Sequence, residues 1–280
     1  MIQSMTDYLL TALDGVDVLA LDVKEARKAI GRTHVLAGER SNAKLAKARG
    51  KGWQTWGLSL APARSAGLPV TVCPEATTGC MRYCVSGSGN AIAFSNVSEG
   101  RQNLTRLLYA HPVAFCRVLV DDVLSASAKP RASGNGCAIR LNVFSDIEWE
   151  RALPLLFELC EPLGVIFYDY TKVLGRSVPP SYRLTLSHSE RNGLGRVASP
   201  ADGSGLPDDR ETYAIAIPVD VKRGHALPST WQGRPVIDGD ADDRRFLDPP
   251  GVAVLLRSKV TRNGRGTAST GRGFILPVIQ

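Results

Sequence analysis

The segment Gly164-Val165-Ile166-Phe167-Tyr168-Asp169-Tyr170-Thr171-Lys172 decides the fold class. It is a short, nearly continuous apolar run that ends in polar residues, which is typical of a strand buried on both faces of a sheet. Comparable runs stand at 53–62, 137–142, 182–186, 213–217 and 252–256. Helical spacing of apolar residues separates several of them, at 98–110, 113–127 and 148–160. We therefore predict a single α/β domain with a largely parallel sheet, in the form of an irregular or partial TIM-like (β/α) barrel.

The chain divides by composition into a lead-in and a core. Residues 1–52 combine amphipathic helical spacing with a Gly, Ala, Lys and Arg-rich stretch, and residues 53–280 form the predicted α/β core domain. The 280 residues are 44% hydrophobic, which is enough for a sizeable core, and no apolar stretch is long enough to span a membrane. Six unevenly spaced cysteines and the lack of a signal-like start lead us to expect a cytoplasmic, reduced protein without membrane contact.

Polar residues recur after the predicted strands. The carboxyl ends of parallel strands meet at one edge of a sheet or barrel, where ligands bind. We expect catalytic roles for three of these residues, namely Asp146, Asp169 and Lys172. We expect cofactor-binding roles for five others, namely Asn142, Ser145, Ser187, Glu190 and Lys259. Each of them taken alone is more often a turn or cap residue, and Asp146 could simply cap the helix that follows it.

Three cysteines lie within twelve residues, in the Pro, Gly and Thr-rich segment from Cys73 through Cys80 to Cys84. Thiolates are soft ligands that select zinc or an iron–sulfur cluster, so this loop is the candidate metal site. A closed zinc site takes four ligands, and the nearest downstream candidates for a fourth are His111 and Cys116. Two alternatives remain open: the cysteines are small buried hydrophobes, or one of them is a redox or catalytic thiol.

The net charge of +7 is concentrated in two basic clusters. The first contains Lys44, Lys47, Arg49 and Lys51, and the second contains Arg257, Lys259, Arg262, Arg265 and Arg272. Such clusters attract phosphates, so a nucleic acid or nucleotide is a candidate partner, although a solvated basic face explains them equally well. The acidic stretch 235–245 lacks the glycine and closing glutamate of an EF-hand, and a turn paired to its own arginines is the simpler interpretation.

The chain resembles the phage- and plasmid-borne "gene product 88" family. The resemblance rests on ordered blocks at 57–62, 72–84, 140–150, 167–172, 184–192, 233–240, 245–249 and 256–259. More distantly, the strand-plus-polar-loop layout and the three-cysteine loop resemble radical SAM proteins, although the Cys-x6-Cys-x3-Cys spacing differs from that superfamily's usual pattern. This second resemblance implies a [4Fe–4S] cluster on Cys73, Cys80 and Cys84, with S-adenosylmethionine bound at the open iron.

Two functions of different classes follow. The first is a radical SAM-like iron–sulfur enzyme that acts on a nucleotide, nucleic acid or peptide. The second is a non-enzymatic nucleic-acid-binding accessory protein in which the cysteines hold a structural metal and the basic clusters contact phosphates. A metal-free hydrolase has little support, because no Ser, His and Asp stand in a suitable strand-loop context.

Overall fold

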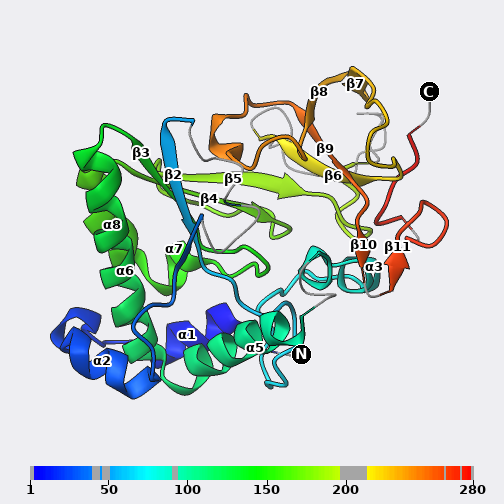
Figure 1. Cartoon of the computed structure of the whole chain (residues 1–280). Helices are drawn as coiled ribbons and strands as arrows, with labels where there is room; N and C mark the ends of the chain where they lie inside the picture. The colour runs from blue at the N-terminus through cyan, green and yellow to red at the C-terminus, as the bar shows by residue number, and fades with distance from the viewer. Residues whose placement is uncertain are drawn as a thin grey trace. The chain divides into compact units, whose positions relative to one another are not determined.

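The structure, a computed structural model, describes residues 3–39, 45, 51–89, 94–195, 213–261, 263–271 and 273–278 (Figure 1). The chain packs into two compact units, each assembled from separate stretches. Unit 1 consists of residues 1–74, 96–169 and 176–183, and unit 2 consists of residues 75–95, 170–175 and 184–280. The predicted boundary at residue 52 stays a prediction.

Unit 1 begins with two short helices, as the amphipathic spacing of the first thirty residues predicts. Helix α1 spans Met5–Ala12 and helix α2 spans Val23–Ile30, with a 3-10 turn, η1, at Val18–Ala20 between them. The Asp22 carboxylate accepts the first free N–H groups of α2, and Gly31 ends that helix at a φ of 61°. Such caps satisfy backbone groups that have no partner inside the helix.

Parallel pairing dominates the strands of unit 1. Strand β2 (Trp53–Gly57) pairs in parallel with β3 (Gly136–Arg140), which pairs in parallel with β4 (Val165–Thr171). The two-residue strand β1 (Ala37–Gly38) is antiparallel to β2. The structure confirms the strands predicted at these three apolar runs.

The helices of unit 1 follow the predicted order but differ in length. They are α5 (Ser95–Ala110, whose first residue belongs to unit 2), α6 (Pro112–Ala132), α7 (Trp149–Ala152) and α8 (Pro154–Cys160), followed by the 3-10 turn η4 (Glu161–Leu163). Pro154 divides α7 from α8, as its missing N–H predicts. Helix α6, however, continues beyond the predicted end at residue 127 and through Pro130, because its packing against α2 and β3 outweighs the loss of one backbone bond near its end.

Unit 2 contains a second set of strands. Strands β6 (Ile215–Val219), β9 (Ala253–Arg257) and β8 (Arg234–Asp238) are mutually parallel, and β6 also pairs in parallel with β5 (Tyr182–Ser187), whose first two residues belong to unit 1. Strand β7 (Thr230–Trp231) forms a hairpin with β8, and β10 (Val260–Thr261) forms one with β11 (Gly264–Arg265). The short helical turns are α3 (Thr78–Arg82), η3 (Val85–Gly87) and η6 (Arg245–Leu247).

The strand order is β1-β2-β3-β4-β5-β6-β9-β8-β7, a nine-stranded and mostly parallel sheet. The predicted α/β class and largely parallel sheet are therefore confirmed. No pairing between β1 and β7 closes a barrel among the described strands. The expected barrel is thus not found, because closure requires a consistent tilt and stagger of strands, which apolar runs do not encode.

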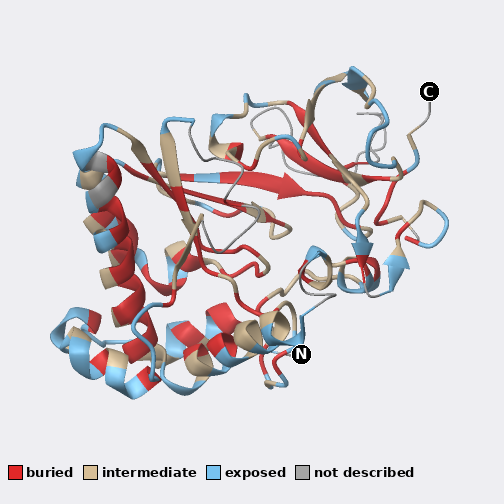
Figure 2. Cartoon of the chain, viewed as in Figure 1, coloured by how far each residue is buried: buried red, intermediate tan, exposed pale blue. Residues whose placement is uncertain are grey.

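Each unit has its own apolar core (Figure 2). In unit 1, Phe115, Trp149 and Phe167 are fully buried. In unit 2, Ile215, Ile217 and Leu255 belong to a buried cluster built on β6 and β9. No helix in the described part of the chain is long and apolar enough to cross a bilayer.

Candidate functional site

Asp169, at the carboxyl end of β4, is the centre of a buried polar network in unit 1. Its side chain is fully buried. One carboxylate oxygen accepts the Asn142 backbone N–H at 2.7 Å, and the other accepts the Tyr182 hydroxyl at 2.6 Å. Arg140 Nε lies 4.0 Å from the same carboxylate. Strands β3 and β4 are adjacent and parallel, so their ends bring Asn142 and Asp169 together as the sequence predicts.

Burial dominates the electrostatics of this network. It raises the pKa of Asp169 to about 7, although the Tyr182 hydroxyl, Arg140 and the Asn142 amide each lower it. The same burial, together with the Asp169 charge, raises the pKa of Tyr182 well above its usual value. A carboxyl group that titrates near neutral pH is suited to proton transfer, and a buried structural carboxyl shows the same shift.

Asn142 shapes the loop that follows β3. Its side-chain oxygen accepts the Ser145 hydroxyl at 2.8 Å and the Ile147 N–H at 2.9 Å, and its amide nitrogen donates to the Ile147 carbonyl at 2.9 Å. Both Asn142 and Ser145 are buried. The two side chains that were expected to contact a cofactor thus make bonds that hold the loop in place.

Asp146 belongs to a second part of this network, around Arg176. The Arg176 guanidinium donates two bonds to Glu150, at 2.9 and 2.6 Å, and lies 3.5 Å from Asp146. These carboxylates, with the neighbouring Tyr182, raise the pKa of Arg176. Asp146 does not cap α7, whose N-cap position is Glu148. Arg176 and Tyr182 carry no strand-end signal, so sequence reasoning missed both.

Cys73 lies beside the same loop of unit 1. Its Sγ accepts the Ala63 N–H at 3.3 Å and lies 3.6 Å from the Phe144 carbonyl oxygen. The adjacent Val72 carbonyl accepts the Asp146 N–H at 2.7 Å. Cys73 is half-buried, so its thiol remains partly accessible. Five of the predicted residues therefore lie in this part of unit 1: Cys73, Asn142, Ser145, Asp146 and Asp169.

Cys80 and Cys84 lie on and just after the one-turn helix α3 in unit 2. The Glu190 carboxylate accepts the Gly79 N–H at 2.7 Å and the Thr77 hydroxyl, while Thr77 accepts the Cys80 N–H at 3.2 Å. Cys84 Sγ accepts the Ser86 hydroxyl at 3.2 Å. The cofactor-binding role of Glu190 stays a prediction, and its bonds in the structure anchor the start of the helix that carries Cys80.

The predicted lysines of unit 2 have different partners. Lys172 Nζ donates to Ser187 Oγ at 2.9 Å and lies 5.8 Å from the centre of the Phe274 ring. Lys259 forms an ion pair with Asp240 in the turn after β8. Lys172 and Ser187 are thus together, as expected for residues at the ends of β4 and β5, whereas Lys259, which lies between β9 and β10, pairs with the acidic turn after β8.

His188, which directly follows β5, is fully buried in unit 2. Its Nδ1 accepts the Gly195 N–H at 3.0 Å, and its Nε2 donates to the Gly273 carbonyl at 2.9 Å. These two bonds fix the neutral tautomer with its proton on Nε2. A structural role for His188 is therefore favoured by its bonding.

The six cysteines fall into two classes. All are free thiols, and Cys73, Cys80 and Cys84 are half-buried. The other three are buried, and burial raises the pKa of Cys116, Cys137 and Cys160 to about 12 each. Cys116, a candidate fourth ligand, is thus a core residue. Within the described residues, no group of three or more His, Cys, Asp or Glu side chains is close enough to hold a metal ion.

Comparison with known proteins gives one positive result. The model of the family described as Gene product 88 matches residues 36–274. No curated protein and no solved structure matches the chain.

Proposed function

The chain belongs to the gene product 88 family, and on that premise we propose that it is a radical SAM-like iron–sulfur enzyme with a [4Fe–4S] cluster on Cys73, Cys80 and Cys84. The observation that supports the proposal is the division of the cysteines into two classes. The three thiols that share one short loop are half-buried, whereas the three scattered ones are core residues with a pKa of about 12. A metal ligand must be accessible, which fits the half-buried first class better than the buried second class.

The donor set fits iron in its chemistry. Three thiolates suit a cluster with one open iron, whereas a closed zinc site requires four ligands. When bound, such a cluster supplies the electron for radical chemistry on S-adenosylmethionine at that iron. Among the described residues, the three cysteines do not lie close enough together to hold a metal ion. The proposal therefore rests on the closeness of the cysteines in sequence and on their accessibility.

The surrounding residues would position the cysteines. The Asn142 bonds that hold the 143–147 loop also fix the neighbourhood of Cys73, because Phe144 of that loop contacts its sulfur. The Glu190 bonds fix the start of the helix that carries Cys80. Asp169, with a pKa of about 7, is the residue best suited to exchange a proton with a substrate. Lys172 is the candidate for binding an anionic group of the substrate, which would be a nucleotide, nucleic acid or peptide.

The decisive experiment is anaerobic purification with iron, sulfide and zinc measured on the same sample. We expect about four irons per chain and an electron paramagnetic resonance spectrum of the reduced protein that changes when S-adenosylmethionine is added. Replacing Cys80 by Ala should remove the cluster, and Cys160→Ala is the matched control because it removes a buried thiol. Stoichiometric zinc, or equal iron in both variants, would contradict the proposal.

Nucleic-acid binding by an accessory protein is the second candidate, and the described part of the second basic cluster does not favour it. Arg257 pairs with Asp238 at 2.8 Å, Lys259 pairs with Asp240, and Arg265 pairs with Asp220 at 3.1 Å. Cations that are paired within the protein attract phosphates less strongly. Arg262, Arg272 and three members of the first cluster, Lys44, Lys47 and Arg49, lie outside the described residues. Binding to nucleic acid with an affinity that falls steeply as the salt concentration rises would support this second candidate.

A further inference from the structure

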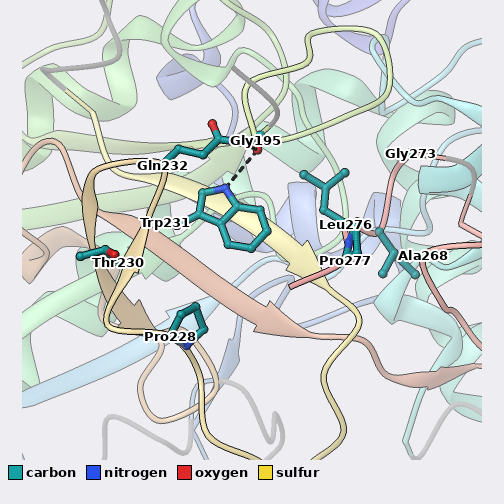
Figure 3. Close-up of a pocket in the computed structure, with 10 residues that line it drawn as sticks. Gly195, Pro228, Thr230, Trp231, Gln232, Ala268, Gly273, Leu276 and Pro277 are labelled. Carbon is teal, nitrogen blue, oxygen red and sulfur yellow. Dashed lines mark hydrogen bonds between the residues drawn. The ribbon is translucent and has the colours of Figure 1, made fainter. Parts of the chain in front are cut away.

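A cavity of about 500 Å³ lies in unit 2 beside the β7–β8 hairpin (Figure 3). Its walls include Trp231, Pro228, Ile275, Leu276 and Pro277, and Thr230 and Gln232 add polar groups. None of the predicted site residues is among the ten described residues that line it. A concave, mostly apolar site of this volume with few polar groups is typical of small-molecule binding.

Gly195 makes the hydrogen bonds that hold one wall of the cavity. Its carbonyl accepts two side-chain donors, Trp231 Nε1 at 3.0 Å and Gln232 Nε2 at 2.9 Å, and its N–H donates to His188. The Trp231 ring is therefore held at its indole nitrogen, as the dashed line in Figure 3 shows. Because His188 also bonds to Gly273, it joins two residues that line the cavity. Side-chain hydrogen bonds therefore hold this wall of the cavity in place.

The hairpin tip adds a second, independent observation. Only two residues, Gln232 and Gly233, connect Trp231 to Arg234, and both have positive φ, 50° and 81°. A two-residue hairpin turn of this kind favours Asn, Asp or Gly, whereas glutamine is strained there. The amide nitrogen of Gln232 reaches the cavity wall at Gly195. A strained residue whose side chain helps to build a cavity wall indicates a functional constraint on the tip.

We propose that this cavity binds an uncharged planar heteroaromatic ring, of the nucleobase type. The Trp231 ring offers a face for stacking, which tolerates any aromatic ring. The ten described residues that line the cavity carry no ionisable side chain. The Gln232 amide and the Thr230 hydroxyl supply hydrogen bonds for the polar edge of a ring. The inference is independent of the cluster, because its residues do not include the cysteines.

The test is calorimetric titration of the metal-free full chain with adenosine, adenosine monophosphate and ribose. We expect saturable binding of adenosine, weaker binding of the monophosphate because none of the ten described lining residues has a charge to compensate the phosphate, and no binding of ribose. Equal binding of ribose, tighter binding of the monophosphate, or no binding of adenosine would overturn the proposal. A Cys80→Ala protein should bind adenosine as the wild type does, which separates this result from the fate of the iron–sulfur hypothesis.

Variants at the cavity provide the control. Ala268 lines the cavity, and its neighbour Ser269 is exposed on the same turn. Ala268→Phe should fill the cavity and weaken adenosine binding about tenfold or more, whereas Ser269→Phe should leave the affinity unchanged. Trp231→Leu should weaken binding to a similar degree, and Trp231→Phe should restore most of it because it keeps a stacking face. Equal affinity in Ala268→Phe and Ser269→Phe would show that adenosine binds elsewhere.

Discussion

Asp169 lies at the carboxyl end of β4 and Glu190 lies just after β5, and the structure gives these two carboxylates different roles. Asp169 is fully buried in unit 1, where Asn142 and Tyr182 donate to it. Glu190 is half-buried in unit 2 and binds Gly79, 111 positions away along the chain. A carboxyl group at or after the end of a strand is thus a member of a buried hydrogen-bond network in one case, and in the other it binds a loop that is distant in the sequence.

The largest difference between the two carboxylates should appear in the free energy of unfolding. Asp169→Ala removes the acceptor of the buried Tyr182 hydroxyl and the Asn142 N–H, and we expect a loss of about 3 kcal/mol in urea denaturation. Asp121→Ala is the matched control, because Asp121 forms a part-exposed ion pair with Arg27 at 2.7 Å and should lose only about 0–1 kcal/mol. Equal losses would show that burial does not set the role of Asp169.

A pH series tests the burial of Asp169 directly. Its folded pKa of about 7 lies above the ordinary aspartate value of 3.8, so the folded protein binds this proton more tightly than the unfolded chain does. The contribution of Asp169 to stability is therefore full below about pH 4 and falls as the pH rises towards about 7. Urea denaturation of the wild type and of Asp169→Asn should differ in slope over this window. Identical slopes would mean that Asp169 is ionised throughout.

A side chain added at Gly79 tests the contact between Glu190 and the start of α3. A Cβ on Gly79 would lie 2.6 Å from Phe274 Cβ and would also collide with the Glu190 carboxylate. We expect Gly79→Ala to lower the free energy of unfolding by about 1–3 kcal/mol, as overpacking does. Gly87, in the same loop region, has no atom within 4 Å of such a Cβ, so Gly87→Ala serves as the control. A loss in both variants would point to a general intolerance of the loop.

The smallest effect is expected from Glu190→Gln, which keeps an oxygen that accepts the Gly79 N–H. The loss of stability should be about 0.5–1.5 kcal/mol, the range of one hydrogen bond. If Glu190 positions the helix of Cys80, the rate of alkylation of Cys80 in the metal-free protein should rise in Glu190→Ala and stay near the wild-type rate in Glu190→Gln. An unchanged rate in both variants would limit Glu190 to a general structural role.

The sequence predicted those parts of the molecule that depend on local patterns. The continuous apolar run at 164–172 gave a parallel strand, and the shared ends of β3 and β4 brought Asn142 and Asp169 together. Strand β8 was missed, because Arg234–Asp238 is only partly buried and lacks an apolar run. The pairing of Arg176 with Glu150 was also missed, since it depends on the path of a loop that no periodicity describes.

The Lys259 prediction shows a further limit of sequence reasoning. The cofactor contact expected of Lys259 stays a prediction, but its ion pair with Asp240, which precedes it by 19 positions, was missed. The acidic stretch was correctly expected to pair within itself at Arg244 and Asp242, which are 2.6 Å apart. Such a short-range pair is apparent from the sequence. A pair between two strand ends depends on strand order, which the sequence leaves open.

The parallel pairing of β2 with β3 has a consequence for folding during synthesis. Trp53 pairs opposite Gly136, about 80 residues later, so β2 remains without this neighbour until β3 has left the ribosome. At ordinary elongation rates that interval lasts about 4–16 s. One contact of helix α1 can form only later still in synthesis, because Thr6 Oγ1 accepts the N–H of Glu148, 142 positions away. Throughout this time the edge of β2 that faces β3 in the folded chain has no strand to pair with, and an unpaired strand edge is a site at which chains associate wrongly.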